Sequence, residues 1–441
     1  MNRVTVCLIV LFLVIGFCIL PSRVNGDNFQ IITINSDGSV SPPDAPLYTV
    51  DNVTYSLTND MTGLITVERD NITLNGAGHD MTGDGNRAGV QLQQVNNVTI
   101  GNMTIGTVGA GIWLYSSSHS VISGNNITGA VNSGILISEY SNNNTVSSNS
   151  ITNSTVGMYL ESSPNNTVSG NNIETYANTG IALHWSPNNI VSGNNVTNNY
   201  FGISCAYSNN ITIIGNTVAD NGFLGIWLVS SNCTICHNNF MNNTNQLDSS
   251  GLPNVWNNDF EGNYWSDYNG SDNNQDGIGD TPYIIDENNT DHYPLMGEFH
   301  DYITRIENSN FIVEITSNST ISAYEVAISE QSSNWYPSSI IIYFNVTGQA
   351  GQGFCRICIT SHLPPSYILI DIGQTPVTFY NGTLFFNSTH RWIYFTYPLS
   401  THKVMIVVPE FPTFLILPLF FIATLFGVFG VIIYRKRLAK G

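Results

Sequence analysis

The sequence predicts an all-β protein: a right-handed, single-stranded parallel β-helix followed by an immunoglobulin-like β-sandwich and one C-terminal transmembrane helix. Three observations lead to this prediction. A short sequence recurs from Gly89 to Phe240 with a nearly constant period, and longer apolar strand patterns replace it after residue 298. An apolar run then reaches Tyr434, just before a basic tail.

Each repeat opens with a glycine and a short apolar segment. The opening glycines are separated by 23, 23, 23, 22 and 23 residues: Gly111, Gly134, Gly157, Gly180, Gly202 and Gly225. A unit this small cannot bury its apolar side until neighbouring units stack on it, so this period indicates a solenoid. Its β-branched, Asn and Gly content favours strands and tight turns over helices. One repeat is therefore one coil, and equivalent residues lie about 4.8 Å apart along the stack.

The repeat places equivalent residues in columns. The third residue of each opening strand is expected to point outward, because the side chains of a strand alternate: Trp113, Leu136, Tyr159, Ala182, Ser204 and Trp227. A second column contains only asparagine: Asn125, Asn149, Asn171, Asn194, Asn216 and Asn238. Stacked amides can hydrogen-bond from coil to coil, so we interpret this column as a structural asparagine ladder.

Composition excludes some partners. The chain has 12 basic and 31 acidic residues, and its first lysine is Lys403. So few cations argue against nucleic acid or an anionic membrane surface as a partner.

The order of segments predicts export and anchoring. Residues 1–26 resemble a signal peptide, 27–260 form the β-helix, 261–297 a cap or linker, and 298–408 the sandwich. Residues 409–441 combine an apolar run long enough to span a membrane with a basic tail that favours a cytoplasmic C-terminus. The bulk of the chain is then extracellular at the cell surface. Sequons in the sandwich, which owe nothing to the repeat, predict glycosylation there: Asn318, Asn345, Asn381 and Asn387.

Several phrases resemble a known family. They are Glu68–His79, the repeated Asn-Asn-Thr-Val-Ser-Gly-Asn, and Gly262–Tyr268. Together, over about residues 50–297, they resemble the NosD-like β-helix family, also described as carbohydrate-binding and sugar-hydrolase repeats. The founding members are periplasmic accessory proteins for the copper enzyme nitrous oxide reductase, so the resemblance implies copper binding as one alternative. Many other members have no assigned reaction.

The C-terminal segment carries a second resemblance. Pro409-Glu410-Phe411-Pro412 before the span is similar to the PEF-type sorting signal of archaeal surface proteins. This implies a sorting enzyme that cuts near the motif and leaves the mature protein covalently anchored, rather than held by the helix.

A loop in the cap has calcium-like spacing. Asp272, Asn274, Asp276 and Asp280 occupy positions one, three, five and nine, and Gly277 occupies position six. These are the spacings of a calcium loop. Position twelve is Tyr283 instead of a carboxylate, so a plain loop of Asx turns is an equal alternative.

Haem and copper are both disfavoured. The sequence Cys233–His237 spells the c-type haem attachment motif, but the coil register continues through it unbroken, which favours buried thiols or a local disulfide. Copper needs clustered soft ligands. The candidate ligands are scattered among columns: His119, His184, His237, Met103, Met158 and Met241.

Two functional hypotheses follow for the coils. The leading one is a non-catalytic protein that binds glycans or surface polymer through Trp113, Tyr159 and Trp227, because flat rings on a rigid face suit sugar rings. The alternative is a polysaccharide-acting glycoside hydrolase, for which Glu139, Glu161 and His184 lie at nearly matching positions on consecutive coils. Hydrolysis needs two suitably spaced carboxylates, and neither lysine nor arginine lies within the repeats to support elimination chemistry.

Overall fold

The computed structural model describes residues 29–409, except 177, 251, 307–308, 330–338, 350, 361–366, 372–375, 378–382 and 387–389. The chain forms two compact units. The first contains residues up to Tyr268 together with Tyr283–His292, and the second contains Asn269–Pro282 and the residues from Tyr293 onward. The segment 261–297 is thus divided between them.

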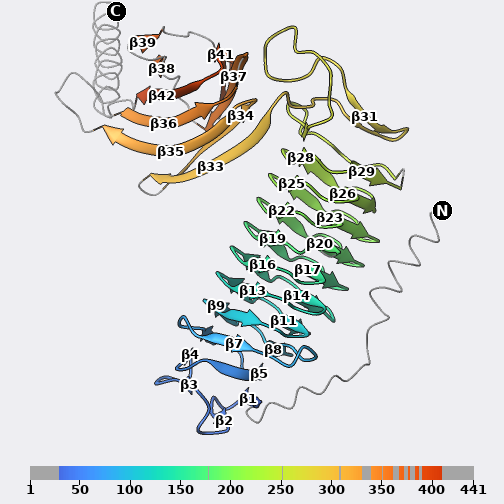
Figure 1. Ribbon diagram of the computed structural model, residues 1–441, viewed down its shortest axis with the longest axis vertical. Coiled ribbons are helices and arrows are strands. Elements are labelled where there is room, and N and C mark those ends of the chain that lie inside the picture. Colours follow the sequence, from blue (N-terminus) through green and yellow to red (C-terminus); the bar gives the residue numbers. More distant parts are fainter. Residues whose placement is uncertain are drawn as a thin grey trace, which may run out of the picture. The chain divides into compact units, whose positions relative to one another are not determined.

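The first unit is a stack of coils, each built from three strands that pair in parallel with the coils before and after (Figure 1). The long-strand sheet contains β1 (Gln30–Ile34), β5 (Met61–Val67), β8 (Val90–Gln93), β11 (Ala110–Tyr115), β14 (Ser133–Ser138), β17 (Val156–Glu161), β20 (Thr179–His184), β23 (Phe201–Ala206), β26 (Leu224–Val229) and β29 (Asn245–Ser249). The predicted parallel β-helix is confirmed, with one repeat for each coil.

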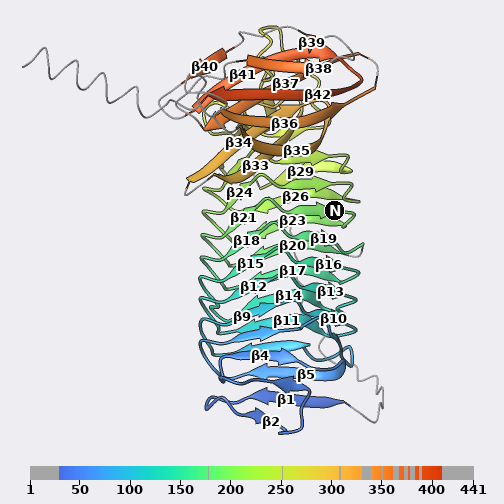
Figure 2. The ribbon, with the colours of Figure 1, turned by 90° about the vertical axis from the view of Figure 1, so that its left-hand side faces the viewer.

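Two sheets of shorter strands complete each coil (Figure 2). The second sheet contains β3 (Leu47–Tyr48), β4 (Thr54–Leu57), β6 (Thr73–Asn75), β9 (Thr99–Gly101), β12 (Val121–Ser123), β15 (Thr145–Ser147), β18 (Thr167–Ser169), β21 (Ile190–Ser192), β24 (Thr212–Ile214) and β27 (Thr234–Cys236). The third contains β7 (Asp80–Thr82), β10 (Thr104–Gly106), β13 (Asn126–Thr128), β16 (Ser150–Thr152), β19 (Asn172–Glu174), β22 (Asn195–Thr197), β25 (Thr217–Ala219), β28 (Asn239–Met241) and β30 (Tyr264–Trp265). At the N-terminal end, β2 (Val40–Ser41) pairs antiparallel with β1, and β3 pairs antiparallel with β4.

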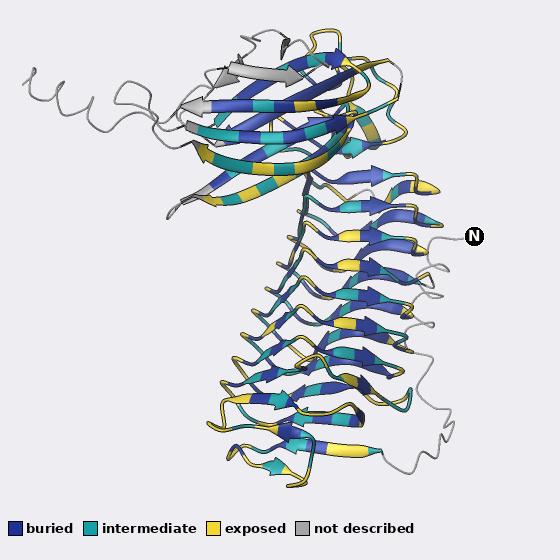
Figure 3. Cartoon of the chain, turned by 60° about the vertical axis from the view of Figure 1, so that its left-hand side comes forward, coloured by how far each residue is buried: buried dark blue, intermediate teal, exposed yellow. Residues whose placement is uncertain are grey.

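Inward-facing side chains fill the coils with a continuous apolar core, so buried and exposed residues alternate along each strand (Figure 3). One fully buried column of the long-strand sheet contains Ile112, Ile135, Met158, Ile181, Ile203 and Ile226. The repeat's glycine is explained by the same packing. At Gly157 a Cβ would lie 2.4 Å from the carbonyl oxygen of Gly180 and 2.3 Å from Cγ2 of Ile173. No other residue fits where the coils approach so closely.

The predicted asparagine ladder is confirmed. Asn194 Nδ2 donates to Asn216 Oδ1 at 2.9 Å and to the carbonyl oxygen of Val168 at 2.9 Å, while Asn194 Oδ1 accepts from Asn171 Nδ2 at 2.9 Å. The same pattern links the other members of the column and continues to Asn263. These amides are buried, so each coil satisfies polar turn groups of its neighbours that water cannot reach.

Aromatic residues close the C-terminal end of the stack. The Trp265 ring stacks on Phe240 at 4.5 Å on one side and on Tyr283 at 4.5 Å on the other. Asp291 Oδ2 accepts hydrogen bonds from Trp265 Nε1 at 2.9 Å and from the backbone N–H of Asn263 at 2.8 Å. Tyr283 and Asp291 belong to a short antiparallel hairpin, β31 (Tyr283–Asp286) and β32 (Asn289–Asp291).

The second unit is a β-sandwich of two antiparallel sheets. The first contains β33 (Glu298–Ile306), β34 (Ser309–Ser317), β37 (Gln352–Thr360), β41 (His390–Pro398) and β40 (Thr383–Phe386). The second contains β35 (Thr320–Ser329), β36 (Ser339–Thr347), β42 (Thr401–Pro409), β38 (Tyr367–Asp371) and β39 (Pro376–Val377). Residues of both sheets, such as Ile357 and Phe344, share one buried core. The immunoglobulin-like assignment stays a prediction.

The predicted signal peptide and transmembrane helix lie outside the described residues. Within the described ranges, no helix has the length and apolar character needed to cross a membrane.

The ladder yields a stability prediction with a matched control. Asn194→Ala should lower the free energy of unfolding by about 3 kcal/mol or more, because several buried groups lose a partner and each such loss costs roughly 1–3 kcal/mol. Asn195→Ala should change it by less than about 0.5 kcal/mol, since that neighbouring side chain is exposed. Urea denaturation of both variants measures the difference. Equal losses would contradict a structural role for the ladder.

Candidate functional site

The predicted ring column lies on the outer face of the long-strand sheet. Trp113, Tyr159 and Trp227 are in one register, point outward and are partly buried. Smaller residues separate them along the column: Leu136, Ala182 and Ser204. Trp113 Nε1 donates to Ser138 Oγ at 2.9 Å, so one edge of that ring is already engaged with the next coil.

More strongly exposed rings lie at the corner that follows this sheet. We call Tyr140, Trp185 and Tyr207 the aromatic corner; their exposed fractions are 71%, 52% and 55%. Trp185 and Tyr207 lie on successive coils, and Ser162 occupies the coil between Tyr140 and Trp185. The N–H of Tyr140 donates to the carbonyl oxygen of Ser162 at 3.0 Å, and the N–H of Ser162 donates to the carbonyl oxygen of His184 at 3.0 Å.

The sequence interpretation missed the aromatic corner because it followed only the alternation within strands. A usable signal exists. Each ring directly precedes a buried serine, in Tyr140-Ser141, Trp185-Ser186 and Tyr207-Ser208, and these serines form a column of their own. The corner rings therefore follow the sequence repeat as well. Their position in the repeat is the turn after the opening strand, not the strand itself.

The backbone at the aromatic corner is strained. Tyr140, Trp185 and Tyr207 have φ values of 61°, 50° and 56°. Bulky residues rarely adopt this left-handed conformation, which costs about 1–2 kcal/mol per residue relative to the right-handed one. Most left-handed corners elsewhere in the coils have glycine, asparagine or another polar residue, for example Gly170 and Asn165, and Tyr176 is a further left-handed ring. Strain retained at exposed positions is a feature of functional sites.

Contacts among the rings order the corner. The His184 ring, which points outward from the end of β20, stacks on Trp185 with centroids 3.9 Å apart. Tyr207 lies 6.2 Å from Trp185 in a near-parallel arrangement. Across the sheet, at the start of β23 and β26, Tyr200 stacks on Phe223 at 5.1 Å. Both edges of the long-strand sheet thus present aromatic pairs on neighbouring coils.

Glu161 and His184 lie side by side on the face between these edges. They are directly paired residues of β17 and β20, and both are partly buried. Burial and the neighbouring Glu139 carboxylate raise the pKa of Glu161. Burial lowers the pKa of His184, which favours the neutral ring. The hydroxyl of Tyr159 lies 3.5 Å from His184 Nδ1.

Glu139 does not lie beside Glu161 on the sheet face, where a catalytic pair of carboxylates would be expected. It does not point from the sheet face, because it is an extra residue at the corner between β14 and the serine column, with φ of 55°. Its side chain is exposed. The structure therefore brings Glu161 and His184 together on the face and leaves Glu139 at the margin. A half-buried acid beside an imidazole and a phenol can donate and accept hydrogen bonds to hydroxyl-rich ligands.

The calcium-like loop belongs to the second unit, and its carboxylates bond to the loop itself. Asp272 accepts from the N–H groups of Asp276 at 3.0 Å and Gly277 at 2.9 Å, and Asp280 accepts from the N–H of Asn273 at 2.7 Å. The buried Arg356 guanidinium donates to the carbonyl oxygen of Asp276 at 2.8 Å, which places a cation against the loop.

In the observed arrangement the side chains of this loop bond to one another and to its backbone. Asn274 Nδ2 donates to Asp276 Oδ2 at 3.2 Å, so its amide faces a carboxylate and not a common centre. Among the described residues, no group of three or more His, Cys, Asp or Glu side chains is placed to hold a metal. The loop has the Asx-turn geometry of the alternative interpretation, and calcium binding stays a prediction.

The haem-like motif is split between environments. Cys233 is a free thiol in the apolar core, and Cys236 is buried at the end of β27. His237 Nε2 lies 3.1 Å from a carboxylate oxygen of buried Glu261. The sulfur atoms considered for copper are also separated, since Met103 and Met158 are inside the core and Met241 is outside it.

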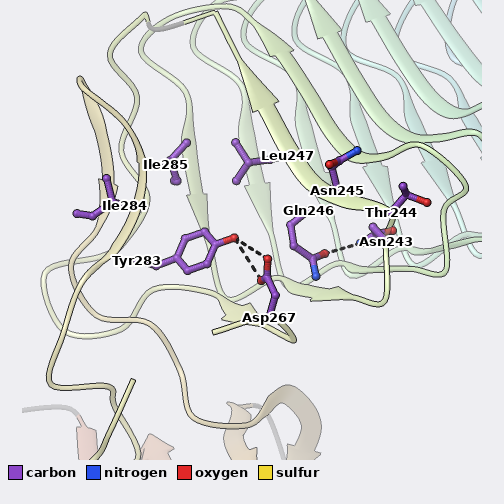
Figure 4. A pocket seen from close by; sticks show the side chains of 9 residues that line it. All are labelled: Asn243, Thr244, Asn245, Gln246, Leu247, Asp267, Tyr283, Ile284 and Ile285. Atoms are coloured by element: carbon purple, nitrogen blue, oxygen red, sulfur yellow. Dashed lines mark hydrogen bonds between the residues drawn. The ribbon is translucent and has the colours of Figure 1, made fainter. Parts of the chain in front are cut away.

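A pocket of about 330 Å³ lies at the C-terminal end of the first unit (Figure 4). Its lining consists of Asn243, Thr244, Asn245, Gln246, Leu247, Asp267, Tyr283, Ile284 and Ile285. The Tyr283 hydroxyl donates to Asp267, and buried Gln246 bonds to both Asn243 and Ser266. Its polar groups thus bond to one another within the cap, as Figure 4 shows for Tyr283 and Asp267.

Comparison with known proteins supports the fold. Residues 88–245 and 156–279 match the family described as "Right handed beta helix region". The coils are thus a right-handed parallel β-helix. No curated protein matches the sequence.

Solved structures that match include three proteins with low sequence identity to this chain. The periplasmic alginate epimerase AlgG is 16% identical, over 48% of this chain and 78% of that chain, with a TM-score of 0.33. Tailspike protein 2 of bacteriophage CBA120 is 13% identical, over 87% and 73%, with a TM-score of 0.40. The DFA-IIIase of Arthrobacter chlorophenolicus A6 is 14% identical, over 45% and 55%, with a TM-score of 0.36. Likenesses this distant carry no inference about activity.

The raised pKa of Glu161 predicts a pH-dependent stability change. Because the folded state holds this proton more tightly than the unfolded chain, ionisation of Glu161 disfavours folding. Glu161→Gln should therefore raise the melting temperature at neutral pH. The gain should vanish well below pH 4.5, the ordinary value for this group, and should grow as pH rises through the raised pKa. Calorimetry across pH tests this, and a gain of equal size in acid would exclude the charge as its cause.

Proposed function

We propose that this protein is a non-catalytic cell-surface β-helix that binds glycans or a surface polymer on the outer face of the long-strand sheet. The aromatic corner is the observation that carries the proposal. Three rings are exposed there, and each has a left-handed backbone conformation that disfavours bulky residues. The adjoining outer face of the long-strand sheet carries further, partly exposed rings. Stability alone would favour asparagine or glycine at these corners.

The surrounding chemistry suits sugars. Aromatic faces supply apolar contact for sugar rings, and the nearby hydroxyl, carboxylate and imidazole groups of Tyr159, Glu161 and His184 supply hydrogen bonds. A stack of coils holds these groups at a fixed spacing of about 4.8 Å per coil. Such a rigid surface loses little conformational entropy on binding.

Cellular location is part of the proposal. Residues 1–26 would direct export, and 409–441 would hold the protein at the cell surface as a membrane span or until a sorting enzyme cuts it. The β-helix is then extracellular, where glycans and surface polymers are available. A NosD-like role in copper delivery is less well supported, because the candidate sulfur ligands Met103 and Met158 are fully inside the apolar core.

Glycoside hydrolysis is the second candidate function. The observation in its favour is Glu161, a partly buried carboxyl whose pKa is raised and which has a second carboxylate, Glu139, nearby. A raised pKa suits a general acid. Glu139 would then have to act as base or nucleophile from the corner, at a separation of about 5 Å for a retaining or 6.5–9.5 Å for an inverting enzyme.

The binding proposal predicts that Trp185→Asn abolishes glycan binding while the fold survives. Asparagine tolerates the left-handed backbone, so strain relief of about 1 kcal/mol offsets the lost ring contacts of about 0.5–1.5 kcal/mol. A glycan array probed with the purified protein measures binding, and calorimetry checks folding. Tyr176→Asn is the matched control, because Tyr176 is also an exposed, left-handed ring but lies at a different corner. Unchanged binding by Trp185→Asn would contradict the proposal.

The two candidates separate in a reducing-sugar assay over a polysaccharide panel. A binding protein should release no reducing ends from any polysaccharide. Release by the wild type that is abolished in Glu161→Gln would establish the second candidate and refute the non-catalytic proposal.

A further inference from the structure

The aromatic corner has one rung without a ring. Tyr140 and Trp185 are two coils apart, about 9.6 Å along the stack at the usual strand spacing. The coil between them places Ser162 at that rung, and its backbone bonds to both neighbouring coils. The largest exposed ring, Trp185, and the most exposed one, Tyr140, therefore flank a position whose own side chain is small.

Acidic groups lie next to this rung. Glu161 immediately precedes Ser162 and faces outward from the sheet, and Glu139 immediately precedes Tyr140. His184 pairs with Glu161 on the next coil, Tyr159 precedes Glu161 by two residues on the same strand, and the Glu139 carboxylate lies nearby. None of these is a permanent cation, so a carboxylate beside the aromatic corner has no positively charged partner among them.

The coils that follow Arg87 offer no lysine or arginine to compensate this charge. The sequence has no lysine or arginine between Arg87 and Arg305. Recognition of anionic sugars normally uses arginine or lysine against carboxylate or sulfate groups. A uronate or sulfated polymer would find only like charge at this face. A ligand with positive charge would instead satisfy Glu161 and be attracted to the faces of Tyr140 and Trp185 by cation–π interactions.

From this arrangement we propose that the glycan recognised at the aromatic corner carries free amino groups, and that an amino-sugar residue sits at the Ser162 rung between Tyr140 and Trp185 with its ammonium on Glu161. The proposal rests on the glycan-binding function and adds the ligand's chemical class. A metal cation is the poorer occupant, because the described residues contain no group of three or more metal-ligating side chains.

Titration calorimetry with three oligosaccharides of equal length tests this inference. The probes are a glucosamine oligomer, the N-acetylglucosamine oligomer and an oligouronate. In neutral low-salt buffer, the wild type should bind the free-amine oligomer at least about tenfold more tightly than the N-acetylated one, as expected for one charge-assisted hydrogen bond. It should bind the oligouronate most weakly. High salt should reduce the preference.

Two carboxamide variants assign the effect to the corner. Glu161→Gln should remove the preference for the free amine, whereas Glu174→Gln should keep it. Glu174 is the matched control, since its carboxylate lies at another corner, where it accepts a hydrogen bond from Asn198 at 2.7 Å. Trp185→Asn should weaken binding of both glucosamine-based oligomers.

Each outcome decides something. Equal or tighter binding of the N-acetylated or uronate probe would refute the amine inference and leave glycan binding standing. A preference that survives in Glu161→Gln would place the amine elsewhere and also refute the inference. If the wild type binds none of these probes and no glycan on an array, the proposed function itself fails.

Discussion

The coils from Asn125 to Asn263 depend on coil-to-coil hydrogen bonding by buried asparagine side chains. Each amide in the ladder bonds to the amide and backbone of the adjacent coil, where water does not reach. A coil can therefore change length only where the ladder is not disturbed. Glu139 shows this: the spacing from Asn125 to Asn149 is 24 residues, yet their side chains still bond at 2.9 Å. The extra residue is accommodated at an outward corner.

Because the coils must stack closely, the inward positions of each coil serve stability, and the outward and corner positions are free to serve binding. Inward positions are apolar and mostly aliphatic, and the opening glycine is fixed by the close approach of neighbouring backbones. Outward and corner positions are under no such restriction. Rings at Tyr140, Trp185 and Tyr207 are therefore additions to a scaffold that would stand without them, and their left-handed backbone makes them costly additions.

Electrostatics narrows what the scaffold can recognise. The chain carries a formal net charge of −19 with histidines neutral, and its β-helix has no lysine or arginine after Arg87. A surface with this charge repels anionic polymers at long range. Where a carboxylate is partly buried, as at Glu161, it also favours cationic ligands over neutral ones. The stacked histidine beside it is favoured in its neutral form, so it does not supply the missing positive charge.

The sequence alone determined the coils, because strand alternation and repeat period are local properties that stacking preserves. The core column, the asparagine ladder and the outward direction of Trp113, Tyr159 and Trp227 could all be predicted from it. It shows that Tyr140, Trp185 and Tyr207 each precede a serine of one column, but not that their rings are exposed at one corner. The direction of a turn residue depends on the sign of φ and on which coil lies next to it, and neither is written in residue spacing.

The carboxylates of the calcium-like loop illustrate the same limit. Their spacing fitted a metal, but spacing does not say what each oxygen will contact. In the folded chain Asp272 satisfies two backbone N–H groups, and Arg356, some 80 residues away in sequence, bonds to the loop carbonyl at Asp276. Only the tertiary structure decided which N–H groups and cations lie against these carboxylates and this loop. The reason is that the packing of the second unit brings distant residues together there.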